Sequence, residues 1–240
     1  MATIVLVHGA WHDSRCWKLL RPILEAAGHT VRTPDLPGHG TRRSQMWRAA
    51  LGGYARAVRD AAASPDGRAV LVGHSMGGAV ITQAAARYPE IVSGLIYLCA
   101  FAPLSGESLV SLAKADKAGG VPASVLPGLW ATRFRQDRAP AVFYNQCTDS
   151  AADEASAALQ PQPNLPTLQR IAGNVLPGTH RAYLLCRKDN AISPAHQGWM
   201  ADRAGIERRI ERDWDHSPFL SAPEELARVL VNMLSEWGAR

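Results

Sequence analysis

The chain has few cysteines, no long apolar run and no cluster of one charge. Its four cysteines, Cys16, Cys99, Cys147 and Cys186, form no C-x-x-C pair and have no metal-ligand spacing with histidine. We therefore expect free, mostly buried thiols and no bound metal. No stretch approaches the roughly 18 to 20 apolar residues of a membrane span. The N-terminal segment also lacks the basic region and cleavage site of a secretory signal. These absences predict a cytoplasmic protein without a membrane partner.

Charge excludes another class of partner. The chain carries 26 Lys and Arg against 21 Asp and Glu, a net charge of +5, but the basic residues are scattered along it. A nucleic-acid-binding protein normally gathers them in a stripe. The densest charged run, residues 207–213, alternates in sign, which is typical of a solvated face. The sequence therefore predicts no nucleic-acid partner.

What is present is a repeated pattern of short apolar runs, each followed by a turn and a helical pattern. This pattern is typical of βα units and a parallel sheet. The predicted strands are residues 4–7, 30–33, 70–72, 94–98, 181–186 and 206–211. Helical spacing is found in residues 17–27 and 79–87, and Ser221 and Glu224 form an S-x-x-E capping box before a final helix.

The middle of the chain breaks this rhythm. Six prolines fall in it, at positions 122, 127, 140, 161, 163 and 166. We predict an inserted helical cap at residues 104–175, between core segments 1–103 and 176–240. The predicted fold class is α/β: a mainly parallel sheet of about six strands flanked by helices, with the cap inserted into it.

The residues Gly73-His74-Ser75-Met76-Gly77 spell G-x-S-x-G directly after a predicted strand and before a predicted helix. This motif places serine on a sharp strand-to-helix turn, where the glycines avoid clashes with neighbouring backbone. Ser75 is therefore the candidate nucleophile.

A serine hydroxyl needs a base to take its proton and an acid to orient that base. In this arrangement the partners follow in the order serine, acid, histidine, on loops after strands. Asp189, directly after strand 181–186, is the candidate acid, and His216, after the last strand, is the candidate base. A turn role for Asp189 and a structural role for His216 stay open.

The other acids fit less well. Asp35 precedes the serine, and Asp213 and Asp215 lie too close in sequence to the candidate base. The backbone amides of Met76, after the nucleophile, and of Ala10, after the first strand, are the candidate oxyanion donors. Gly9 allows close backbone approach, and His8 is expected to be structural.

With these residues in place, the chain resembles the α/β-hydrolase superfamily across nearly its full length. It resembles in particular the branch of plant methylesterases, hydroxynitrile lyases and related bacterial esterases. The resemblance rests on residues 5–12, 17, 24, 27–29, 35–36, 73–78, 189–192, 197, 199–200 and 215–218. The N-terminal and C-terminal parts of the chain match the family well, and the predicted cap matches it loosely.

The resemblance implies an enzyme without a cofactor. Cyanohydrin lyases of the branch carry threonine, glutamate and lysine where this chain resembles the esterases with Gly9, His74 and Ser217. Ser217 supplies no charge for a departing cyanide, which favours ester hydrolysis. A lyase-type carbonyl chemistry and a hydrolase-fold small-molecule receptor remain the alternatives.

Aromatic residues suggest the substrate. We expect the pocket to be lined by Trp11, Trp130, Phe134, Phe143 and Tyr144, beside Gly9, His74 and Ser217. The weak polar content of the cap predicts a moderately hydrophobic ester as the small-molecule partner, with aromatic esters among the candidates. The sequence leaves open whether the protein forms a homodimer.

Overall fold

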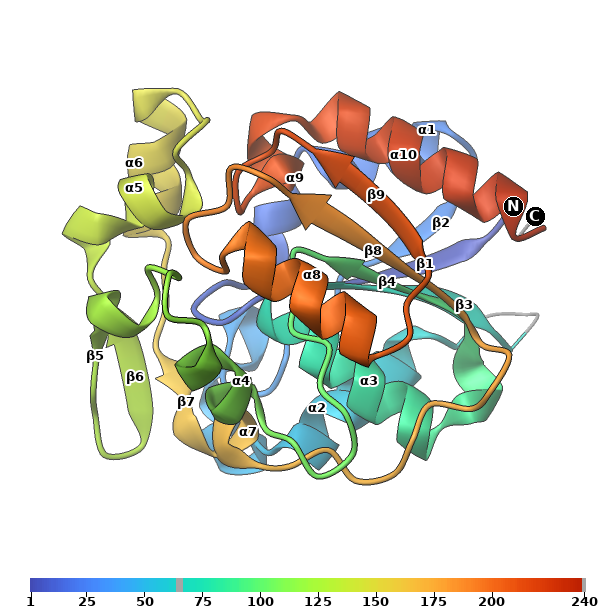
Figure 1. Ribbon diagram of the computed structural model, residues 1–240, viewed down its shortest axis with the longest axis horizontal. Helices are drawn as coiled ribbons and strands as arrows, with labels where there is room; N and C mark the ends of the chain where they lie inside the picture. The colour runs from blue at the N-terminus through green and yellow to red at the C-terminus, as the bar shows by residue number, and fades with distance from the viewer. Residues whose placement is uncertain (64–66, 239–240) are drawn as a thin grey trace.

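A parallel sheet of six strands runs through the part of the chain that the structure describes, residues 1–63 and 67–238 (Figure 1). The structure is a computed structural model, and residues 64–66 and 239–240 of the predicted core segments lie outside the described residues. The strand order is β2-β1-β3-β4-β8-β9, and every neighbouring pair is parallel. The strands are β1 Thr3–Val7, β2 Thr30–Arg32, β3 Ala69–His74, β4 Val92–Leu98, β8 His180–Cys186 and β9 Arg208–Arg212. The predicted fold class and its six strands are confirmed, with ends that differ by up to two residues.

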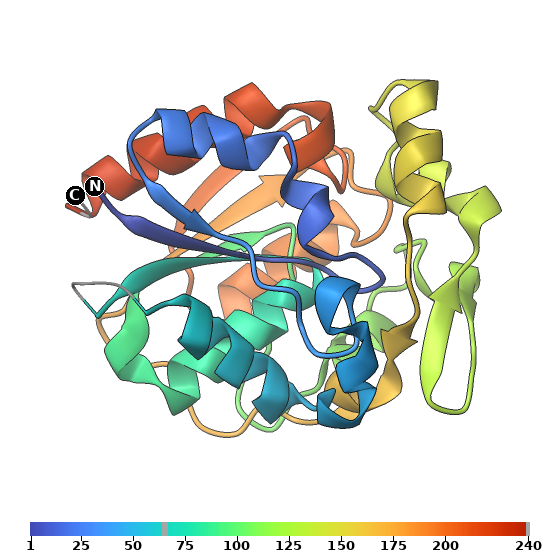
Figure 2. The same cartoon turned by 180° about the vertical axis from the view of Figure 1, so that it is seen from behind.

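Helices cover both faces of this sheet (Figures 1 and 2). Because side chains alternate along a strand, Ile4 and Leu6 face one layer while Val5 and Val7 face the other. The first layer contains α1 Leu20–Ala26, α9 Pro218–Ser221 and α10 Pro223–Glu236, and the second contains α2 Leu51–Ala61, α3 Met76–Arg87 and α8 Pro194–Arg203. Segments of 3-10 helix lie between strands and helices, at η1 Ser14–Trp17, η2 Gly40–Arg48 and η3 Pro89–Ile91.

The predicted capping box at the last helix is wrong. Helix α10 begins at Pro223 after Ala222, with no side-chain cap, and Ser221 is the last residue of α9. The Ser221 hydroxyl donates instead to the Asp215 carboxylate at 2.7 Å. A buried carboxylate is costly unless its oxygens accept hydrogen bonds, and Asp215 is fully buried, which accounts for this use of the hydroxyl.

The segment between β4 and β8 lies across the carboxyl ends of the strands, at the left of Figure 1. It contains α4 Leu109–Ala115, η4 Pro122–Ser124, β5 Val125–Leu126, β6 Ala131–Phe134, η5 Gln136–Arg138, α5 Ala139–Phe143, α6 Asp149–Ala157, β7 Gln162–Pro163 and α7 Asn164–Leu168. The three strands form a small antiparallel sheet, β5-β6-β7. The cap is therefore helical and stranded, where the sequence predicted helices alone. Its exact boundaries at 104 and 175 stay a prediction.

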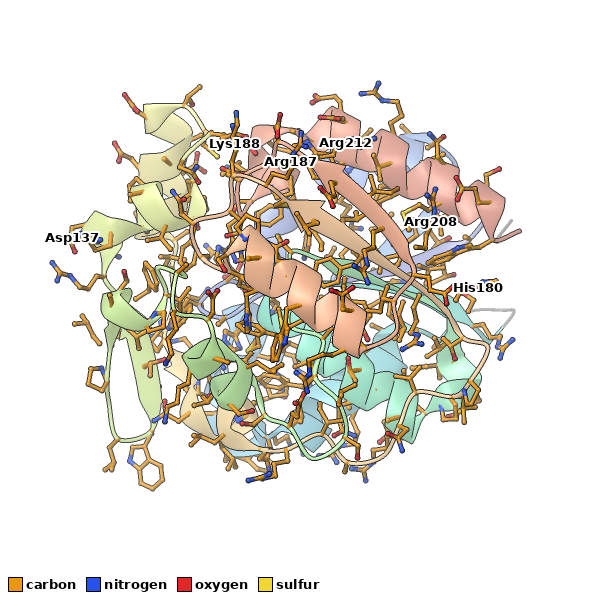
Figure 3. All side chains as sticks on the ribbon, viewed as in Figure 1. Asp137, His180, Arg187, Lys188, Arg208 and Arg212 are labelled. Atoms are coloured by element: carbon orange, nitrogen blue, oxygen red, sulfur yellow. The ribbon has the colours of Figure 1, made fainter. Side chains whose placement is uncertain are left out.

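Charged side chains lie on the outside of this framework. Arg208 and Arg212 of β9 pair with Glu236 and Glu225 of α10, at 2.9 and 3.1 Å (Figure 3). Asp137 lies at the outer side of the cap, where it pairs with Arg135 (Figure 3). Across the described ranges, no helix is long and apolar enough to span a bilayer.

Candidate active site

Ser75 occupies a sharp turn between β3 and α3. Its φ of 53° lies in the left-handed region, which few residues other than glycine adopt. A Cβ on Gly77 would lie 2.4 Å from the Val7 carbonyl oxygen, and one on Gly73 would lie 2.5 Å from the Gly77 carbonyl oxygen. Both glycines are therefore required by close backbone contact, as the G-x-S-x-G pattern predicted. The turn lifts Ser75 out of the sheet, where it is only half-buried.

Asp189 and His216 meet through a buried hydrogen bond. His216 Nδ1 lies 2.8 Å from Asp189 Oδ2, and because a carboxylate accepts, Nδ1 carries the proton. The backbone amides of Ala191 and Ile192 donate to Asp189 Oδ1 at 2.7 and 3.0 Å. This leaves His216 Nε2 as the unprotonated nitrogen in neutral imidazole. The structure therefore brings the predicted acid and base together in the tautomer that a general base needs.

Gln197 of α8 orients the acid, a role that sequence reasoning did not assign. Its amide nitrogen donates to Asp189 Oδ2 at 2.9 Å and to the Ile192 carbonyl at 2.8 Å. Its amide oxygen accepts from the Cys186 backbone at 3.1 Å. The signal was faint, because a buried glutamine on a helix after the acid loop has no motif of its own.

The two predicted oxyanion donors are buried and unengaged. Ala10 is 6% exposed and Met76 is 2% exposed. Within residues 1–63 and 67–238, neither backbone amide donates a hydrogen bond. Buried amides without an acceptor are uncommon in folded proteins, so the pair is suited to receive an anionic oxygen. Gly9 allows the backbone after β1 to approach Ser75 closely, because a Cβ on Gly9 would lie 3.0 Å from Ser75 Cβ.

His74 lies beneath the candidate base and is completely buried. Its Nε2 lies 2.8 Å from the His216 carbonyl oxygen, so Nε2 carries the proton. Cys99 Sγ lies 3.4 Å from the same oxygen. Burial lowers the pKa of His74 well below its ordinary value. His74 is thus a neutral donor to the backbone of the base.

One group of described side chains has the proximity of a metal site. The potential ligand atoms of His74, Cys99 and His216 lie within 4.8 Å of one another. A metal needs a lone pair from each ligand, yet His74 Nε2 holds a proton aimed at the His216 carbonyl and His216 Nδ1 holds one aimed at Asp189, which leaves one nitrogen of each ring. Burial also raises the pKa of the Cys99 thiol well above its usual range. The donor set does not suit a cation.

Two further histidines support the strand end after β1. His8 accepts from the Leu36 amide at 3.2 Å and lies 2.9 Å from the Gly9 carbonyl oxygen, which agrees with a structural role. His12 Nδ1 lies 2.7 Å from the Ala10 carbonyl oxygen, and its Nε2 lies 2.9 Å from the Tyr144 hydroxyl. The cap is thereby tied to the backbone that carries a candidate oxyanion donor.

Four of the five predicted aromatic residues are buried together, including Tyr144, whose ring centroid lies 5.9 Å from that of Phe143, and Trp130 is exposed. Trp11, Phe134 and Phe143 pack together, with ring centroids 4.3 to 6.2 Å apart. Phe143 also stacks on the His216 ring at 5.5 Å. Trp130 lies elsewhere: it is 78% exposed, in the turn between β5 and β6. The structure therefore brings three of the four predicted tryptophan and phenylalanine side chains to the site and leaves Trp130 outside it.

The loop of the candidate base is also bonded to the cap. Asp215 Oδ2 accepts from the Gln146 amide at 3.2 Å, while Oδ1 accepts from the Ser217 amide at 3.0 Å.

The predicted pocket residue Ser217 is fully buried, and its hydroxyl has no partner among the described residues. Arg187 and Lys188 lie on the neighbouring loop after β8, at the outer surface (Figure 3).

Comparison with known proteins agrees with this architecture. Residues 4–229 match the alpha/beta hydrolase family. The chain is 31% identical to a pyrethroid hydrolase of Sphingobium wenxiniae, over 95% of this chain and 86% of that one. It is 28% identical to salicylic acid-binding protein 2 of Nicotiana tabacum, over 97% of each.

A crystal structure shows the same fold. A pyrethroid hydrolase of Sphingobium faniae superposes with a TM-score of 0.84, at 27% identity, over 98% of this chain and 97% of that one. The family match covers nearly all the residues that build the sheet and the site. The chain belongs to the alpha/beta hydrolase family, in the branch that contains methylesterases and bacterial pyrethroid hydrolases.

Proposed function

We propose that the protein is a serine carboxylesterase that acts through an acyl-enzyme. Its proposed substrates are moderately hydrophobic esters, including aromatic ones. The observation that carries the proposal is the Asp189–His216 hydrogen bond of 2.8 Å, together with the strained turn that holds Ser75. Similarity to ester hydrolases of the same branch supports it.

The proposed mechanism begins with proton transfer. His216 Nε2 takes the Ser75 proton as the serine oxygen attacks the ester carbonyl carbon. The charge of the imidazolium is stabilised by Asp189, which already accepts its Nδ1 proton. Within the described part of the chain the Ser75 hydroxyl forms no hydrogen bond. The serine–histidine contact is therefore one that we expect to tighten when substrate binds.

The remaining steps use the backbone. The Ala10 and Met76 amides hold the negative oxygen of the tetrahedral intermediate, a contribution typically worth 10²–10³ in rate, roughly, for one donor. His216 then returns its proton to the alcohol oxygen as the ester C–O bond breaks. Water, deprotonated by the same imidazole, cleaves the acyl-enzyme and releases the acid.

The proposed substrate preference rests on the aromatic cluster of Trp11, Phe134 and Phe143. Phe143 is 2% exposed and covers the imidazole of the base, so an apolar group beside the reacting carbonyl displaces little ordered water. Asp137 of the cap lies on its outside, and the buried Asp116 is already engaged by the amide and hydroxyl of Ser193. Neutral, apolar acyl or alcohol groups are therefore favoured over charged ones.

A substrate panel tests the proposal. p-Nitrophenyl esters of increasing acyl length, with aryl and methyl esters beside them, are assayed with wild type and with Ser75→Ala. We expect turnover by wild type and a loss of at least about 10³-fold in the variant, with unchanged circular dichroism. A serine-directed phosphonate should inactivate wild type and add its mass to Ser75 alone.

Several outcomes would contradict the assignment. Activity retained by Ser75→Ala, or a phosphonate adduct elsewhere, would remove Ser75 from the mechanism. Cyanide release from mandelonitrile without ester turnover would favour the lyase alternative. Tight ligand retention with at most a single turnover would favour a receptor, a reading that the name of the tobacco relative keeps in view.

A further inference from the structure

A cavity lies between the core and the cap. It has a volume of about 270 Å³ and is bounded by η1, α6 and α9. In Figure 2 the yellow helix α6 of the cap stands beside the core, and the Lys18–Glu154 ion pair joins η1 to it. None of Ser75, Asp189 and His216 is among the lining residues.

The interior of the cavity is largely apolar. The alanine, leucine and phenylalanine side chains that line it are Ala151, Ala155, Ala158, Leu159, Phe219 and Leu220. An apolar cavity of about 150 Å³ is large enough to bind benzene. The space here is therefore large enough for one aromatic ring with a short substituent.

One end of the cavity is polar and oriented. Both His12 and Tyr144 line it, and they are hydrogen-bonded to each other at 2.9 Å. Because His12 Nδ1 donates to the Ala10 carbonyl oxygen at 2.7 Å, neutral His12 must accept at Nε2. The Tyr144 hydroxyl is then the donor, and its oxygen keeps lone pairs that no other described residue uses. That oxygen can accept one hydrogen bond from a ligand.

The charges around the cavity cancel. Lys18 pairs with Glu154 at 2.5 Å, and Arg15 pairs with Asp13 at 2.7 Å. Burial lowers the pKa of His12 to about 4 and raises the pKa of the Cys16 thiol and the Tyr144 hydroxyl, so these three neighbours are neutral near pH 7. An anion such as a carboxylate would find no unpaired cation, and a cation no unpaired anion. A neutral ligand fits this lining best.

We propose that this cavity is a second binding site, for a small neutral aromatic alcohol whose ring fills the apolar part and whose hydroxyl donates to Tyr144 Oη. The site lies outside the catalytic group and does not depend on ester hydrolysis. It is connected to that group by two hydrogen bonds, from Tyr144 to His12 and from His12 to the carbonyl of Ala10. A bound alcohol therefore contacts the cap and the oxyanion strand together.

The first experiment measures binding by calorimetry on the Ser75→Ala protein, which removes turnover. The probes are benzyl alcohol, toluene as its apolar counterpart, and benzoate as its anionic counterpart. We expect benzyl alcohol to bind about two- to tenfold more tightly than toluene, the usual range for one net hydrogen bond, and benzoate to bind weakest. In Tyr144→Phe, benzyl alcohol and toluene should bind equally. Benzoate binding as tightly as benzyl alcohol, or an unchanged alcohol preference in Tyr144→Phe, would overturn the proposal.

The second experiment locates the site. Ala155→Phe places a ring in the cavity, and Ala157→Phe makes the same change on the same helix at an exposed position. Benzyl alcohol affinity should fall at least tenfold in the first variant and stay unchanged in the second. Equal affinity in the two would refute the site.

An NMR measurement on unmutated protein covers the case in which Ala155→Phe does not fold. Ring protons of bound benzyl alcohol should show nuclear Overhauser contacts to the methyl groups of Leu159 and Leu220, which line the cavity. Contacts only to Trp11 and Phe143 would place the alcohol in the catalytic pocket and overturn the second site. Such a result would leave the esterase proposal standing, and loss of esterase activity would leave the binding result standing.

Discussion

Replacing His12 with glutamine should remove part of the acid sensitivity of the folded protein. Burial lowers the pKa of His12 from 6.5 to about 4. The unfolded chain therefore binds more protons than the folded one between these values. By linkage, stability is present above pH 6.5 and is lost as pH falls towards 4, where the folded state also takes up the proton.

The size of the effect follows from the two pKa values. A difference of about 2.5 between them corresponds to about 3 kcal/mol of unfolding free energy. About 2 kcal/mol of this is lost between pH 7 and pH 5, because the unfolded imidazole is nearly fully protonated at pH 5 while the folded one is not. Glutamine does not titrate, so its own cost is the same at both pH values.

Urea unfolding at pH 7 and pH 5 measures this difference. The stability lost between the two pH values should be about 2 kcal/mol smaller in His12→Gln than in wild type. His180→Gln, at an exposed position on β8, is the matched control and should lose as much as wild type. An equal loss in His12→Gln and wild type would show that His12 is not held as a neutral base in the folded state.

Three further substitutions test the site. Asp189→Asn should lower kcat about 10⁴-fold without unfolding the protein, because the amide favours the wrong imidazole tautomer; a loss under tenfold in a steady-state assay would contradict the role of acid. Gly77→Ala, whose Cβ would meet a backbone carbonyl at 2.4 Å, should lower the melting temperature or prevent folding, whereas Gly198→Ala, whose Cβ would meet nothing closer than Leu185 Cδ1 at 4.0 Å, should not. Phe143→Leu should reduce kcat/KM for aryl esters, and Trp130→Leu, at a 78% exposed position, should leave it unchanged; the reverse order would exclude the proposed pocket.

The sheet was predictable from the sequence because each buried strand is a short apolar run, flanked by turns, on a chain with few other apolar stretches. The run at β3 is an example: Ala69–His74 is buried throughout. The positions of the candidate acid and base follow from a related argument. The carboxyl ends of parallel strands meet at one edge of the sheet, so residues that follow β8 and β9 are expected at the same edge as Ser75, which follows β3.

The cap was less predictable. Strands β5 and β7 have two residues each, too few to show any alternation. The exposure of Trp130 depends on the turn between β5 and β6, which composition does not reveal. Gln197 and His12 were counted in the family resemblance but given no role, because their hydrogen-bond partners are distant in sequence or in another element: the Asp189 carboxylate for Gln197, and the Tyr144 hydroxyl for His12.

Strained backbone conformations occur at the edge of the sheet where the strands have their carboxyl ends. Across the described residues, positive φ outside glycine occurs at Trp11, Ser75 and Cys99, with values of 61°, 53° and 35°. Each residue follows the carboxyl end of a different strand, β1, β3 or β4. Such conformations cost about 1–3 kcal/mol each and persist only where packing enforces them. The core holds Cys99 against the carbonyl of His216 and the cap holds Trp11 through Thr132, so sheet and cap together fix the geometry around Ser75 before any substrate arrives.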